Sequence, residues 1–92
     1  MNPSRNVRVS PDVVSQKVGD ETVLLNLRTG VYWGLNRTGA VIWEEIAKHG
    51  DVPRIVAALQ REFVGTEQQM ASAVHGLLDE LSREGLVVLD ET

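Results

Sequence analysis

The feature that most constrains the fold is a change of hydrophobic period around residue 35. Val31–Trp33 continues a strand pattern that Gly34 ends, whereas from Asn36 onward the apolar residues recur at helical spacing. This short stretch also holds the single tyrosine of the chain and the first of its two tryptophans. Because strands and helices place side chains at different periods, one element cannot satisfy both patterns. The chain is therefore predicted to pass here from the last strand of a sheet into a helix.

The predicted sheet is a three-stranded antiparallel meander in the N-terminal third. Its strongest strand is Thr22–Leu27, which is rich in β-branched and leucine side chains. A loop at residues 28–30, with glycine where a positive φ is needed, leads into Val31–Trp33. Upstream, the valines of residues 7–18 predict one edge strand or two short ones, with Pro11 at a bend because proline cannot donate to a ladder.

Three helices follow, each with a capping residue at its start and a glycine at its end. The third has a capping-box pattern and a long apolar stripe at residues 70, 74, 77, 78 and 81. Residues 86–89 are predicted to form a short terminal strand or an extended tail. The caps and closing glycines are Asn36 or Thr38 with Gly50, Asp51 with Gly65, and Thr66 (boxed with Gln69) with Gly85.

These elements predict an α+β fold. A three-stranded antiparallel N-terminal sheet followed by three helices and a short strand has the outline of a winged helix-turn-helix. At 92 residues the chain is expected to form a single domain spanning residues 1–92.

The residues that usually carry catalysis or bind metals are sparse and badly placed for it. There is no cysteine, and His49 and His75 lie on different predicted helices without a metal-binding spacing. The acidic pairs 44–45 and 79–80 are adjacent on helices, so their side chains point about 100° apart and form no acid–base dyad. We therefore expect no enzyme activity, no metal and no cofactor.

Hydropathy and charge bear on whether the protein binds a membrane or a nucleic acid. No segment approaches the roughly 18 apolar residues of a membrane span, so a cytoplasmic protein without a membrane partner is expected. The formal charge is −4, with +1 in residues 1–35 and −5 in residues 36–92. The third predicted helix carries Arg83 together with four acidic residues. It is therefore poorly suited to bind the phosphate backbone of a nucleic acid. A DNA-binding regulator therefore stays only as an alternative, and the acidic helical surface is either merely solvated or favours a basic peptide.

The aromatic strand is the better candidate for a binding site. As the last strand of the meander, Val31–Trp33 has one edge for which no partner strand is predicted, and an extended peptide can add to such an edge. The alternative is that Tyr32 and Trp33 only fill the core. Successive side chains of a strand point to opposite faces, so one of the two can reasonably be buried in the core. Burial of both would require the strand to be covered on its two faces.

Several segments closely resemble the PqqD-like family of leader-peptide recognition elements, which serve pathways that modify ribosomally made peptides. The specific core is Gly30–Asn36 followed by Gly39-Ala40 and Ile42-Trp43, and the resemblance extends over Val23–Leu27, Ile55–Leu59, Leu77–Leu81 and Gly85–Val87. The Tyr-Trp form of the core is most similar to the small stand-alone recognition proteins of lasso-peptide clusters.

The resemblance implies a non-catalytic adaptor that holds a precursor's leader as an added strand, in a groove shared with the third helix. It would deliver the precursor to a leader peptidase, a transglutaminase-like cysteine protease, and through it to a macrocyclase. A pyrroloquinoline quinone pathway chaperone, presenting its precursor to a radical SAM enzyme, is the nearest alternative. On this chain the peptide-binding residues would be the backbone of Val31, Tyr32 and Trp33, an apolar wall of Met70, Ala73, Val74 and Leu77, and the acids Asp79 and Glu80.

Overall fold

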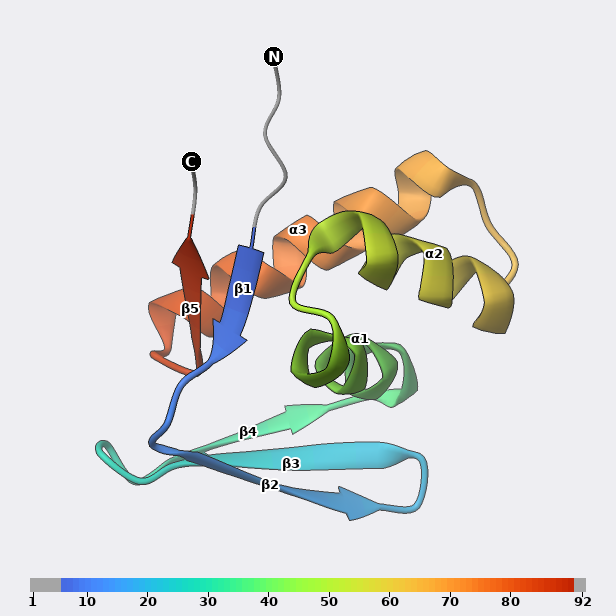
Figure 1. Ribbon diagram of the computed structural model, residues 1–92. Helices are drawn as coiled ribbons and strands as arrows, with labels where there is room; N and C mark the ends of the chain where they lie inside the picture. Colours follow the sequence, from blue (N-terminus) through green and yellow to red (C-terminus); the bar gives the residue numbers. More distant parts are fainter. Residues whose placement is uncertain (1–5, 91–92) are drawn as a thin grey trace.

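In the computed structural model, which describes residues 6–90, a twisted antiparallel sheet lies beneath a layer of helices (Figure 1). Its strands are β2 (Val13–Val18), β3 (Glu21–Asn26) and β4 (Val31–Leu35), in the order β2-β3-β4. The predicted α+β class and the three-stranded antiparallel meander are therefore confirmed. The predicted end of the last strand at Gly34 is wrong. Gly34 pairs with Val23 in the ladder and β4 continues to Leu35, because this glycine takes no positive φ.

The first and last strands form a separate small sheet. β1 (Asn6–Val9) pairs antiparallel with β5 (Val87–Asp90), and Arg8 Nε lies 2.9 Å from Asp90 Oδ2 across the pair. The valine-rich segment before the meander is thus two strands, and only the second of them joins the sheet. The terminal segment is a strand, which was one of the two predicted alternatives.

The helices begin where their capping residues predict. They are α1 (Arg37–Lys48), α2 (Val52–Glu62) and α3 (Glu67–Arg83). Asn36, not Thr38, caps α1 by accepting the Gly39 N–H at 2.9 Å, and both halves of the predicted capping box open α3. The predicted closure of α2 at Gly65 is wrong. The helix stops at Glu62 because Phe63 takes an extended conformation and packs against the core.

The core lies between the helices and one face of the sheet. Leu24 on β3 is fully buried, whereas the exposed large apolar residues of β2 and β4 include Val14 on the opposite face. We call the face that carries Leu24 the inner face and the opposite one the outer face. The helices contribute most of the fully buried side chains, namely Ile42, Ile55, Leu59, Val74, Leu78 and Leu81.

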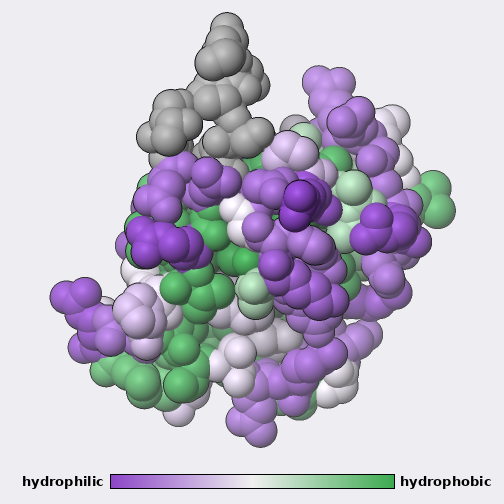
Figure 2. Space-filling model, viewed as in Figure 1, coloured by the Kyte–Doolittle hydropathy of each residue, from purple (hydrophilic) through white to green (hydrophobic). Residues whose placement is uncertain are grey.

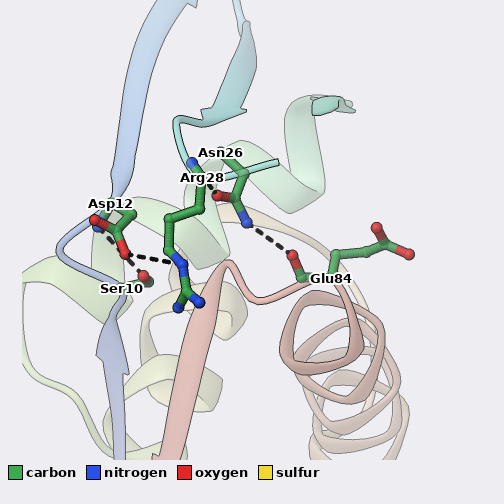
Figure 3. A network of polar contacts seen from close by, with 5 residues as sticks. All are labelled: Ser10, Asp12, Asn26, Arg28 and Glu84. Atoms are coloured by element: carbon green, nitrogen blue, oxygen red, sulfur yellow. Dashed lines mark hydrogen bonds and ion pairs between the residues drawn. The ribbon is translucent and has the colours of Figure 1, made fainter. Parts of the chain in front are cut away.

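A polar network fixes the sheet to the far end of α3 (Figure 3). Buried Asn26 donates through Nδ2 to the main-chain carbonyl of Glu84 at 3.1 Å and accepts the Arg28 N–H on Oδ1 at 2.9 Å. Arg28 Nε in turn lies 3.8 Å from Asp12 Oδ2, and the main-chain N–H of Asp12 donates to Ser10 Oγ at 3.3 Å. The network links the β1–β2 connection and the end of β3 to the C-terminal end of α3.

Candidate functional site

The outer edge of β4 is an open sheet edge. In the part of the chain that the structure describes, β4 pairs with β3 on one side and with no strand on the other. Its N–H and C=O groups on that side are available to an extended chain, because an antiparallel ladder uses only every second residue of a strand.

Two hydrogen bonds show which residues of β4 direct their main-chain groups toward the open edge. The Leu27 N–H donates to Asp12 at 2.8 Å toward β2, whereas the Asn26 carbonyl accepts the Gly30 N–H at 2.7 Å on the β4 side. Because main-chain groups alternate in direction along β3, those of Asn26 and Leu24 point toward β4. These two residues pair with Val31 and Trp33. The main-chain groups of Tyr32 and Gly34 therefore point away from β3. Of the three predicted backbone positions only Tyr32 faces outward, and Gly34 was not predicted.

Beside this edge lies a groove of about 340 Å³ between β4, the start of α1 and α3. From α3 it is lined by Ala73, Leu77 and Glu80, which repeat at helical spacing and so share one face of the helix. Trp33 is half-buried on the inner face of β4 and forms the opposite wall. The other lining residues, from the strand–helix junction, are Gly34, Leu35, Asn36, Thr38, Gly39 and Ile42.

The predicted wall on α3 divides between two faces of that helix. Ala73 and Leu77 line the groove, but Met70 is only 7% exposed and Val74 is fully buried in the core. Met70 and Val74 can therefore support the groove from behind but cannot contact a ligand in it. Of the two predicted acids, Glu80 lines the groove, while Asp79 is exposed and is not part of its lining.

The aromatic residues of β4 have different roles. Tyr32 is 69% exposed on the outer face, so it does not fill the core, whereas Trp33 packs against the core cluster. Val31, at 44% exposure, begins the strand at its hairpin end. Apolar side chains gather there, at the lower left of Figure 2, which looks from the same side as Figure 1. The surface at the hairpin end of β4 is thus partly apolar.

The junction residues of the groove were missed as site residues, although the sequence carries a signal for them. Gly39 allows the first turn of α1 to approach β4, since a Cβ there would lie 3.2 Å from Leu35 Cδ2. The sequence marks Asn36 as a helix cap and places Asn36 and Gly39 in the core of the family resemblance, but it does not predict either of them as a site residue. Their place in a groove depends on how α3 packs across the junction, which no local pattern encodes.

Two further properties of the described residues bear on function. Within residues 6–90 no three His, Asp or Glu side chains converge in a way that could hold a metal ion. Among the same residues, no helix has the length and apolar character needed to cross a membrane.

The chain is similar to one protein family and to two solved structures. Residues 21–87 match the family described as Coenzyme PQQ synthesis protein D (PqqD). The solved structure "TbiB1 in Complex with the TbiA(beta) Leader Peptide" is 31% identical, with a TM-score of 0.83 over 87% of this chain and 93% of that one. "Lasso peptide synthetase B1 complexed with the leader peptide" is 23% identical, with a TM-score of 0.82 over 90% and 98%, and it shows likeness of fold. The curated proteins include no match.

Proposed function

The chain belongs to the PqqD family, and we propose that it is a non-catalytic adaptor that binds the leader of a lasso-type precursor peptide. The observation that carries this proposal is the open edge of β4 directly beside the groove of Trp33, Ala73 and Leu77. A structure 31% identical to this chain was solved with a leader peptide, which supports the same class of ligand here.

Binding would proceed by strand addition to β4. The leader backbone would exchange hydrogen bonds with the outward groups of Tyr32 and Gly34, which give affinity without reading sequence. The leader residue opposite Trp33 would direct its side chain onto the inner face, because paired residues share a face. That side chain would enter the groove between Trp33 and Leu77. An apolar residue fits this position best.

Charge would supply a second preference. Glu80 borders the groove, and residues 36–92 carry a net charge of −5. A basic leader residue near Glu80 would gain from this field, and Asp79 on the exposed side of α3 would add to it. Since both acids are exposed, the gain would be modest and would weaken with added salt.

In this proposal the adaptor delivers its precursor to separate enzymes and performs no chemistry itself. The partners would be a leader peptidase of the transglutaminase-like cysteine protease type and a macrocyclase. Delivery would take place in the cytoplasm, where ribosomes make the precursor. We interpret the fold as a winged helix-turn-helix, with α2 and α3 as the helix pair and β1 with β5 as the wing.

A pyrroloquinoline quinone pathway chaperone remains the second candidate, because the matching family is described by that pathway. The lasso-type proposal is preferred because the structures similar over most of this chain were solved with leader peptides, one of them described as a lasso peptide synthetase component. A DNA-binding regulator is disfavoured by the net charge of −4.

Fluorescence anisotropy tests the proposal. The probe is the fluorescein-labelled leader of the precursor encoded beside this protein, with the leader of a radical SAM pathway precursor and a DNA duplex for comparison. We expect saturable binding of the first probe alone. Equal or tighter binding of the second would favour the alternative pathway. Binding only to the duplex, with a steep salt dependence, would contradict both peptide proposals.

A further inference from the structure

The two outside strands of the three-stranded sheet, β2 and β4, differ in how they are protected against pairing with another chain (Figure 1). β2 carries Ser15, Gln16 and Lys17, and a lysine on an edge strand hinders the approach of a further strand. β4, with the sequence Val-Tyr-Trp-Gly-Leu, has no charge and no proline, and its ladder with β3 contains no bulge. These are the devices by which proteins usually protect an open edge. β4 therefore remains open to pairing.

The spacing of the outward main-chain groups makes this edge complementary to itself. Tyr32 and Gly34 direct their main-chain groups away from β3, and Trp33 lies between them. When two copies of β4 run antiparallel about a two-fold axis at Trp33, Tyr32 of each copy lies opposite Gly34 of the other. Both of these are hydrogen-bonded pairs, each of which exchanges two hydrogen bonds, and the two Trp33 residues form the non-hydrogen-bonded pair between them.

Other two-fold axes use the edge less fully. An axis at Tyr32 would set Gly34 opposite Gly30, whose N–H is already bonded within the hairpin. An axis at Gly34 would set Tyr32 opposite Asn36, which caps α1 and whose carbonyl already accepts an N–H of that helix. Only the axis at Trp33 places the outward strand residues of one copy opposite the outward strand residues of the other.

The side chains fit the same register. Residues directly opposite each other in a sheet share a face, so the exposed Tyr32 of one copy would lie beside Gly34 of the other. A Cβ built on Gly34 meets no atom within 4 Å, which leaves room for the ring. An aromatic ring placed against a strand glycine stabilises a sheet at that point. On the inner face the two half-buried Trp33 side chains would form an aromatic pair.

We propose that in the absence of leader β4 pairs with β4 of a second copy, so that the three strands of each copy join in one continuous sheet. The second copy and the leader would compete for the same edge, and the dimer would be the leader-free resting state. The competition rests on the proposed function, whereas the dimer does not.

Charge keeps this dimer weak. Each copy has a formal charge of −4, so two copies repel each other. Added salt screens this repulsion and should strengthen the dimer. The same salt should weaken the attraction between Glu80 and a basic leader residue, so the two binding events respond to salt in opposite directions.

Sedimentation velocity of the full chain tests the dimer. We expect the wild-type protein to change from monomer to dimer as its concentration rises. Two double variants test the register, one with Tyr32→Lys and Gly34→Lys, the other with Tyr32→Glu and Gly34→Glu. Each should associate at least tenfold more weakly than wild type, because like charges then face each other across the axis, and an equimolar mixture of the two should form a heterodimer. Both changed positions are exposed, so the thermal midpoints should confirm that the variants are folded.

The matched control places the same charges on the outer face of β2, as Gln16→Lys with Val18→Lys, and should leave the dimer intact. Adding the leader of the precursor encoded beside this protein should convert the dimer into a complex of one protein and one leader. A protein that is monomeric at every concentration but binds the leader overturns the dimer and leaves the adaptor function intact. A dimer that persists in both charge variants, or that binds leader without dissociating, uses another surface and also overturns the proposal. A dimer that forms as expected while no leader binds overturns the adaptor function alone.

Discussion

The side-chain amide of Asn26 donates a hydrogen bond of 3.1 Å to the main-chain carbonyl of Glu84, so the end of β3 is fixed to the C-terminal end of α3 (Figure 3). Gly85 follows with a φ of 73°, and a Cβ there would lie 3.3 Å from Asn26 Nδ2. Because α3 and β4 form opposite walls of the groove, we expect this bond to affect the width of the groove. The site therefore depends on a contact outside its own lining.

Replacing Asn26 tests that dependence. Asn26→Ala should lower the free energy of unfolding by about 1–3 kcal/mol, because it removes the two hydrogen bonds made by a buried side chain. Urea denaturation measures the change, with Gln60→Ala on the exposed side of α2 as the control. At temperatures where the variant stays folded, leader affinity should also fall. Unchanged stability would show that solvent replaces the bond.

Proline substitutions separate the outward and inward residues of β4. Tyr32→Pro removes an N–H that points away from β3, which an edge strand tolerates, so the protein should stay folded and lose leader binding. Trp33→Pro removes an N–H directed at β3 and should unfold the sheet. Circular dichroism measures whether each variant is folded, and fluorescence anisotropy measures its affinity for the leader. A folded Tyr32→Pro variant with full affinity would rule out strand addition at this edge.

Leu77 and Leu78 are adjacent leucines with different environments and give a matched pair. Leu78 is fully buried, and Leu78→Ala should cost roughly 2–5 kcal/mol of stability through the cavity it leaves. Leu77 is half-buried and lines the groove, so Leu77→Ala should cost less stability and more leader affinity. Chemical denaturation and anisotropy are measured on both variants. If the two exchange these effects, the groove lies on another face of α3.

Much of this outcome is encoded locally and could be predicted from the sequence. The strand-to-helix change after Leu35, the Asn36 cap and the capping box at Thr66 each involve residues within a few positions of one another. The pairing of β1 with β5 could not be predicted. Some 80 residues separate the two strands, and the sequence of neither strand indicates which other strand it pairs with.

The division of α3 into two faces was also beyond sequence reasoning. Met70 and Val74 suit a groove wall as well as a core, and Leu77 appears on the same apolar stripe. The rotation of α3 decides between these roles, and that rotation follows from the packing of α2 and the sheet against it. Gly34 was read as a strand terminator because glycine usually interrupts strands, whereas here it lies inside the ladder.

Two ion pairs predict the response to acid. The hydrogen bond from Lys17 at 2.7 Å lowers the pKa of Glu44, and Arg8 lowers the pKa of Asp90. A carboxyl group with a lowered folded-state pKa contributes stability that is present above its unfolded value and is lost as pH falls through the folded value.

The thermal midpoint should therefore hold from neutral pH to about pH 5 and fall below about pH 4, where such carboxyl groups take up protons. Glu44→Gln should reduce this fall. Glu62→Gln serves as the control, because the Glu62 side chain makes no ion pair within residues 6–90. The effect should be small, because both pairs lie at the surface. A midpoint that rises on acidification would contradict the assigned direction.

The most direct test of the central claim is amide hydrogen exchange, followed by NMR, with and without the leader peptide. The N–H group of Trp33 is directed at β3 and should be protected in both states. The N–H groups of Tyr32 and Gly34 should exchange quickly in the free monomer and become protected when the leader binds. Protection gained at Tyr32 and Gly34, with shifts at Ala73, Leu77 and Glu80, is the predicted result. Protection gained only on β2 or β5, or none at saturating leader, would contradict it.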